Sequence, residues 1–383
     1  MEPMTARQIA GAVDGVWLNP GENAPAVTAV CTDSRRPEPG CLFLPWVGTR
    51  FDGHDFIDAA LDAGAAGCLC ARVPEKLRED KFYIQVPDTR LALKALASAY
   101  RDQFSIPVIQ VTGSVGKTTT KEMIAAVLGA KLKVWKTPEN YNNDVGTPLA
   151  LLGLTREHEA AVIETGMNHF GEIEYLTEMV KPDIAVISNV GDAHIEYLGS
   201  RQGILKAKCE IFSHLKKDGL AILNGDDALL DTVTVPFRTV RCGKSEHCQA
   251  RITEISDYGV EGIRCTISTE KGRNPLSIPA PGEHMAYAAA IAAAVGGDCP
   301  RRGLLCPGGK PHAGPPSVGA ADDSGRLLQR QPPIRGGGPG NSGPDGLRQA
   351  GGRLGRHGRA GSHREPGALQ HGGPGRHAGR RSG

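Results

Sequence analysis

The chain has 383 residues, 40% of them hydrophobic, which is enough to build the cores of two or three domains and excludes a wholly disordered or fibrous protein. Charge is unevenly distributed along it: residues 301–383 contain 14 Lys and Arg against 4 Asp and Glu, a net charge of +10, together with 23 of the 50 Gly. Residues 1–300 contain 30 Lys and Arg against 38 Asp and Glu, a net charge of −8, which is typical of an acidic enzyme and not of a nucleic-acid-binding protein.

No segment predicts a membrane span or a targeting signal. Apolar runs fall short of the roughly 18 residues that a transmembrane helix needs, and the start, MEPMTARQIAGAVDG, lacks the basic and then apolar order of a signal peptide. The ten Cys show no CxxC spacing, which argues against a zinc ribbon or a disulfide framework. We therefore expect a cytoplasmic protein that contacts no membrane.

Residues 1–102 are expected to form a small α/β domain. Three stretches have helical periodicity, namely TARQIAGAVDG, FIDAALDAGAAG and TRLALKALASAYRDQF. Short apolar strands such as CLFLP and KFYIQV lie between them.

Residues 103–296 repeat a strand, a turn and a helix. Apolar strands such as PVIQVTG, EAAVIETG and DIAVISNVG alternate with helical stretches of about 10 to 15 residues, and this alternation predicts a central, doubly wound parallel sheet. Ligands bind such sheets at the carboxyl ends of the strands, where the polar motifs of this chain fall. The pattern stops at about Gly296.

The first strand of this region leads into a glycine loop, TGSVGKTTT. Backbone N–H groups freed by Gly113 and Gly116 can face a polyphosphate at a helix N-terminus, Lys117 can neutralise it, and the Thr118 hydroxyl can reach Mg²⁺. A glycine turn that only joins strand to helix is the alternative, but GKT at this junction favours a nucleotide. Val111 stands where the usual loop has its first Gly, so the loop is shortened. The predicted contacts with ATP in this loop are Gly113, Ser114, Val115, Gly116, Lys117, Thr118 and Thr119.

Shortened TGSxGKTT loops are typical of the Mur ligases, and the chain resembles that family over roughly residues 5–295. The Asn-rich stretch PENYNNDVGTPLALL is similar to the F-type branch, and the blocks ETGMNHFGEI, SNVGDAHIEYLGS and AKCEIF follow in the family's order. Upstream, TDSRRPEPGCLFLPWVGTRFDGHDFI resembles the UDP-sugar-binding domain that E-type and F-type members share.

The resemblance implies an ATP-dependent ligase that adds D-alanyl-D-alanine to UDP-N-acetylmuramoyl-tripeptide in the synthesis of peptidoglycan precursors. In the family, the terminal carboxylate becomes an acyl phosphate, and the amino group of the incoming dipeptide displaces phosphate. Such chemistry needs charge neutralisation around the γ-phosphate more than it needs a protein nucleophile. ATP and Mg²⁺ are the implied cofactors, and we expect a monomer that acts on small molecules.

Four residues are implied to carry the chemistry: Lys117, Glu164, His194 and Lys208. Glu164 ends a strand and offers a hard oxygen to Mg²⁺, together with Thr118. His194 matches the family's second metal position, and Lys208 matches a lysine whose carbamylation in Mur ligases turns a cation into a metal-binding anion. From the residues alone, the alternatives are a carboxylate that caps a loop, a solvated His and a surface Lys.

Further contacts are carried over from the resemblance. Asn224 and His284 match positions near the nucleotide, and Ala288 stands where the family commonly has Asn. Thr32, Ser34 and Arg35 are expected beside the uridine or pyrophosphate, and Asp52, Gly53 and His54 are expected to form a turn that lines the same site. A DG turn and a helix N-cap are the alternative interpretation. The predicted substrate-binding residues are Ser34, Arg35, Asp52, Gly53, His54, Asn140 and Asn143.

Residues 297–383 are predicted to be a disordered Gly/Arg/Pro-rich tail in place of the family's Rossmann-like third domain, because they contain too few apolar residues for a core. Two motifs of that domain, DDxYNANPxS and LGDMxELG, are absent. Both become permissible when the degenerate codons of 325–335 and 353–361 are read one base later. We therefore predict a frameshift between Gly296 and Pro300, and poor turnover by this chain.

Two other functions stay open. The first is the E-type Mur ligase that adds the third amino acid, against which the NYNND block argues. The second is a non-catalytic nucleotide-binding protein whose basic tail contacts nucleic acid.

Overall fold

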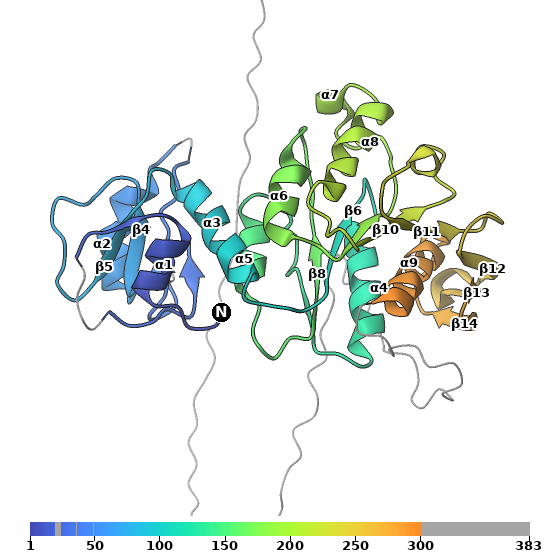
Figure 1. The fold of residues 1–383 in the computed structure, drawn as a ribbon, viewed down its shortest axis with the longest axis horizontal. Helices are drawn as coiled ribbons and strands as arrows, with labels where there is room; N and C mark the ends of the chain where they lie inside the picture. The colour runs from blue at the N-terminus through green and yellow to red at the C-terminus, as the bar shows by residue number, and fades with distance from the viewer. Residues whose placement is uncertain (20–23, 36, 49, 300–383) are drawn as a thin grey trace, which may run out of the picture. The chain divides into compact units, whose positions relative to one another are not determined.

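The computed structural model describes residues 1–19, 24–35, 37–48 and 50–299 (Figure 1). The predicted tail over 297–383 lies outside the described residues except for its first three. Of the interval from Gly296 to Pro300 in which the frameshift is predicted, only Pro300 lies outside them. Among the described residues, no helix combines the length and the apolar character needed to cross a bilayer.

The N-terminal region forms a five-stranded sheet in the order β1-β5-β4-β3-β2, parallel except for β1. Its strands are β1 (Val16–Trp17), β2 (Val30–Cys31), β3 (Leu42–Phe43), β4 (Gly67–Cys70) and β5 (Phe82–Gln85). The three predicted helices are present as α1 (Ala6–Ala12), α2 (Ile57–Asp62) and α3 (Thr89–Arg101). Helix α3 begins at Thr89 because the Asp88 side chain accepts hydrogen bonds from the N–H groups of Arg90 and Leu91.

A second sheet of nine strands has the order β14-β13-β12-β11-β10-β9-β6-β8-β7. Strands β6 to β12 run parallel, and β13 and β14 add an antiparallel edge. The strands are β6 (Val108–Thr112), β7 (Val134–Lys136), β8 (Ala160–Glu164), β9 (Ile184–Ile187), β10 (Leu220–Asn224), β11 (Arg238–Gly243), β12 (Ala250–Asp257), β13 (Ile263–Thr269) and β14 (Gly272–Ile278).

Helices cover both faces of this sheet, as predicted for a doubly wound α/β fold (Figure 1). They are α4 (Lys117–Gly129), α5 (Gly146–Leu152), α6 (Glu172–Val180), α7 (Ile195–Leu198), α8 (Arg201–Cys209) and α9 (His284–Asp298). In β6, Ile109 and Val111 pack in the cluster that contains α4 and α9, whereas Val108 packs in the cluster that contains α5 and α6. Both faces of the central strands are therefore buried, which explains their uninterrupted apolar sequences.

The topology brings distant polar residues to one edge. Strands β8, β6, β9 and β10 are neighbours and parallel, so their carboxyl ends meet. The glycine loop follows β6, Glu164 ends β8, Ser188 and Asn189 follow β9, and Asn224 ends β10.

Candidate nucleotide and metal site

The glycine loop after β6 is shaped by two glycines. Gly113 has no room for a side chain, because a Cβ there would lie 2.0 Å from Ser188 Oγ. Gly116 has φ +74°, a left-handed conformation that L side chains rarely adopt, and α4 begins at the next residue without a side-chain cap. The start of α4 therefore keeps unpaired N–H groups, which form the positive end of the helix.

Two lysines converge near this loop. Lys117 Nζ donates to the Gly113 carbonyl at 3.0 Å, and burial lowers the pKa of Lys117, an effect that the charge of Glu164 opposes. Lys208, on α8, is only 2% exposed; burial and then the positive charge of Lys117 lower the pKa of Lys208 to about 7. The fold therefore places the predicted Lys208 amine inside the site and not on the surface.

Glu164 is buried and held by three side chains. Thr118 Oγ1 donates to Glu164 Oε2 at 3.0 Å, and Asn142 Nδ2 donates to Oε1 at 2.8 Å. Lys121 Nζ lies 3.6 Å from Oε2 and donates to the Thr137 carbonyl at 2.9 Å. Asn142 belongs to the Asn-rich stretch that carries the family resemblance, but neither it nor Lys121 was predicted as a site residue.

The two predicted asparagines of the NYNND block lie elsewhere in that loop. Asn143 Oδ1 accepts from the N–H groups of Val145 at 3.2 Å and Gly146 at 2.8 Å, so it caps the start of α5. The backbone carbonyl of Asn140 accepts a hydrogen bond from the N–H of Asn142 at 2.7 Å. Both therefore shape the loop that presents Asn142 to Glu164.

The donor set around Glu164 fits magnesium. The hydroxyl of Thr118 and one carboxylate are hard oxygen ligands already in contact, and Mg²⁺ is commonly held by one or two carboxylates together with phosphates. No group of three or more His, Cys, Asp or Glu that could hold a metal exists in the described part of the chain, so a closed metal cage is absent there. His194, with φ +65° ahead of α7, makes no hydrogen bond or ion pair with Glu164 or the loop among the described residues.

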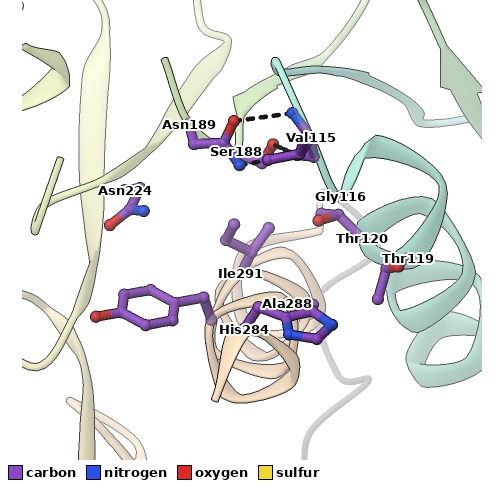
Figure 2. Close-up of a pocket in the computed structure, with 11 residues that line it drawn as sticks. Val115, Gly116, Thr119, Thr120, Ser188, Asn189, Asn224, His284, Ala288 and Ile291 are labelled. Atoms are coloured by element: carbon purple, nitrogen blue, oxygen red, sulfur yellow. Dashed lines mark hydrogen bonds between the residues drawn. The ribbon is translucent and has the colours of Figure 1, made fainter. Parts of the chain in front are cut away.

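Beside the loop lies a pocket of about 350 Å³ (Figure 2). It is lined by Val115, Gly116, Thr119, Thr120, Ser188, Asn189, Asn224, His284, Tyr287, Ala288 and Ile291. The structure thus brings together the predicted Asn224 and His284 with part of the loop, whereas Ser188, Asn189 and Tyr287 were missed. The signal for the first two was a polar pair directly after an apolar strand.

Asp226 anchors the far wall of this pocket. It accepts hydrogen bonds from Tyr287 Oη at 2.8 Å, Ser245 Oγ and the N–H of Lys244. Burial raises the pKa of Asp226, but these hydrogen bonds outweigh it and lower the pKa to about 2. An ionised carboxylate therefore orients Tyr287 at neutral pH.

The predicted UDP-contact residues form two separate groups in the first domain. Arg35 pairs with Asp33 at 2.7 Å on an exposed loop that also carries Thr32 and Ser34. Asp52, Gly53 and His54 build a tight turn.

That turn is held by its own contacts. His54 Nδ1 lies 2.6 Å from Asp52 Oδ1, and His54 Nε2 accepts the N–H of Ala71 at 2.9 Å. The Gly53 N–H donates to the Trp46 carbonyl at 2.8 Å, and a Cβ on Gly53 would lie 2.4 Å from the Trp46 nitrogen. The side chains of Asp52 and His54 and the backbone of Gly53 therefore have a structural part in the turn.

Comparison with known proteins identifies the family. Residues 111–296 match the Mur ligase middle domain and residues 26–101 match the Mur ligase family catalytic domain. The chain is 42% identical over 293 residues to the UDP-N-acetylmuramoyl-tripeptide--D-alanyl-D-alanine ligase of Bacillus subtilis, covering 76% of this chain and 63% of that relative.

Solved structures give the same result. MurF from Acinetobacter baumannii superposes with a TM-score of 0.72 and 35% identity over 77% of this chain and 64% of its own. MurF ligase from Thermotoga maritima in complex with ADP superposes with a TM-score of 0.64 and 31% identity, over 70% of this chain and 62% of its own. The chain thus spans a little over three fifths of the length of these relatives. Two matched domains in sequence order, and relatives of this identity on the same fold, show that the chain belongs to the Mur ligase family.

Proposed function

We propose that this chain carries the nucleotide and UDP-sugar parts of an ATP-dependent ligase that joins D-alanyl-D-alanine to UDP-N-acetylmuramoyl-tripeptide. The observation that carries the proposal is the convergence of Lys117, Glu164 and Lys208 at one edge of the sheet, in a chain whose similar relatives are named for this reaction. The sheet edge supplies positive charge and hard oxygen ligands together, which phosphoryl transfer requires.

Each residue has a distinct part in the proposed reaction. The N–H groups at the start of α4 and the Lys117 amine would bind the β- and γ-phosphates of ATP. Thr118 and Glu164 would hold Mg²⁺, which when bound neutralises phosphate charge during transfer to the tripeptide carboxylate. Asn142 and Lys121 orient Glu164. The amino group of the dipeptide then attacks the carbonyl carbon of the acyl phosphate and loses a proton. An amide bond forms as phosphate leaves.

Lys208 would act as a carbamate. Carbamylation needs a neutral amine, and a pKa of about 7 leaves a large neutral fraction at physiological pH. Addition of CO₂ to Nζ with loss of one proton converts the amine to an anion, which would relieve the repulsion between Lys208 and Lys117 and could support the metal. We also propose His194 as a second metal ligand, through movement of the loop ahead of α7.

The E-type reaction is the second candidate, since both branches share the UDP-sugar domain. The similar relatives favour the F type, because the Bacillus subtilis protein is named for the addition of D-alanyl-D-alanine. The nucleic-acid-binding alternative and the frameshift depend on residues 297–383, of which nearly all lie outside the described residues. Resequencing codons 285 to 383 tests the frameshift: one inserted or deleted base is expected, and a confirmed frame would contradict it.

A binding titration tests the proposed function in the chain as it stands. Isothermal titration should show one site for Mg²⁺-ATP and one for UDP-N-acetylmuramoyl-tripeptide. Lys117→Ala should weaken ATP binding at least tenfold and leave the UDP-sugar affinity unchanged, since a charge-assisted phosphate contact is lost. Lys206→Ala, on the exposed side of α8, is the matched control and should bind both ligands like the wild type. Absence of ATP binding by the wild type would refute the proposal.

A further inference from the structure

The peptide that joins Val115 to Gly116 is held by two side chains of the loop after β9 (Figure 2). Its carbonyl oxygen accepts hydrogen bonds from Asn189 Nδ2 at 2.8 Å and from Ser188 Oγ at 3.1 Å. The N–H of Val115 donates to Asn189 Oδ1 at 3.0 Å, and the N–H of Ser114 donates to the same oxygen at 3.1 Å. One carboxamide therefore binds both backbone polar groups of Val115.

This contact fixes the direction of the next N–H group. A trans peptide is planar, with its C=O and N–H pointing in opposite directions. Because the Val115 carbonyl points toward Asn189, the Gly116 N–H must point away from it. Among the described residues, the N–H groups of Gly116, Lys117 and Thr118 form no backbone hydrogen bond, so they stay available at the start of α4.

The backbone of the loop does not choose this orientation by itself. Gly116 lacks a Cβ and accepts both signs of φ, so the preceding peptide could turn over at little steric cost. In the turned orientation, the Val115 carbonyl oxygen would face the position of the phosphates and repel them. A further bond, from the Gly191 N–H to Ser114 Oγ at 2.9 Å, ties the two loops together.

We infer that Ser188 and Asn189 are positioning residues that hold the Val115–Gly116 peptide with its N–H toward the phosphates of the nucleotide. This inference rests on the proposed function, since it requires that a polyphosphate binds the glycine loop. The effect of losing either side chain must then grow with the number of phosphates on the ligand. Loss of a residue that only stabilises the fold would lower the affinities for adenosine and for ATP by the same factor.

The test is a set of titrations with adenosine, AMP, ADP and ATP in the presence of Mg²⁺. Asn189→Ala removes both hydrogen bonds of the carboxamide to Val115, and the affinity for ATP is expected to fall roughly tenfold while that for adenosine is unchanged. Ser188→Ala removes one of two donors and should lower ATP affinity roughly threefold.

Two variants separate positioning from other roles. Asn189→Asp keeps an acceptor for the N–H groups but sets an anionic oxygen against the Val115 carbonyl, so it should lose at least as much ATP affinity as Asn189→Ala. Tyr287→Phe alters the opposite wall of the pocket and should change all four affinities by one common factor.

Three results would overturn the inference: equal losses for adenosine and ATP in Asn189→Ala, wild-type ATP affinity in Asn189→Ala, or wild-type ATP affinity in Asn189→Asp. If Asn189→Ala does not fold, Ser188→Ala decides the question. Equal losses of adenosine and ATP affinity in Ser188→Ala, or wild-type ATP affinity, would then overturn the inference. Absence of ATP binding by the wild-type chain would refute the proposed function as well, and is thus distinguishable from failure of the inference alone.

Discussion

Replacement of Lys208 by Met is predicted to stabilise the fold at neutral pH. The amine is 2% exposed, forms no ion pair with any described carboxylate, and lies near the charge of Lys117. Burial lowers the pKa of Lys208 from 10.5 to about 7. At pH 7, a shift of this size corresponds to a destabilisation of roughly 4 kcal/mol. Because such contributions vary by factors of two to three with context, we expect Lys208→Met to raise the free energy of unfolding by about 2 kcal/mol.

The pH dependence of this gain identifies its cause. Between about pH 7 and 10.5, the unfolded chain binds more protons than the folded one, so wild-type stability rises with pH across this window. The advantage of Lys208→Met should therefore be full at and below pH 7 and should disappear as the pH approaches 10.5. Urea unfolding at several pH values in CO₂-free buffer measures the stability gain of Lys208→Met and its dependence on pH.

The matched control is Lys206→Met, on the same helix but exposed. It should change the free energy of unfolding by less than about 0.5 kcal/mol at every pH. The reasoning would be refuted if Lys208→Met were less stable than the wild type at pH 7, or if its advantage did not change with pH. Since Lys208 is also the proposed carbamate, Lys208→Met should lose ligase function when the third domain is restored, which is the expected cost of replacing a buried functional amine for stability.

Three further predictions concern neighbouring groups. Asp226→Asn should lower the free energy of unfolding by about 1 kcal/mol at pH 7, and urea unfolding should show this loss shrink as the pH falls from 4 toward 2, because the wild-type carboxylate then becomes protonated. Gly113→Ala should weaken ATP binding at least tenfold in titrations, since its Cβ displaces the Ser188 hydroxyl, and the loss should be smaller in a Ser188→Ala background. Glu164→Gln should abolish the dependence of ATP affinity on Mg²⁺ while leaving adenosine binding unchanged, and an undiminished Mg²⁺ effect would exclude Glu164 as the ligand.

The fold was predictable because its signals are local. The strand, loop and helix around Gly113 and Lys117 occupy one short stretch of sequence, and the buried strands of the doubly wound sheet are continuous apolar runs. The short strands β1, β2, β4 and β7 were not predicted individually, because two to four residues outside a longer apolar run carry too little periodicity.

The side-chain contacts were less predictable, because they depend on tertiary packing. The sequence shows Lys208 on a helix, but only the packing of α8 makes its amine buried. Within NYNND, nothing in the spacing distinguishes Asn142, which contacts Glu164, from Asn143, which caps α5. The contact of Asn189 with Val115 joins residues 74 positions apart and depends on β9 lying next to β6.

The most direct test of the account is to find the substrate pair that makes the protein release ADP from ATP. With the third domain restored by correction of the predicted frameshift, ADP should form, with a UDP-N-acetylmuramoyl-pentapeptide, only when UDP-N-acetylmuramoyl-tripeptide and D-alanyl-D-alanine are both present. Lys117→Ala should abolish it. ADP release with the UDP-dipeptide and a single diamino acid, and none with the tripeptide and D-alanyl-D-alanine, would contradict the account.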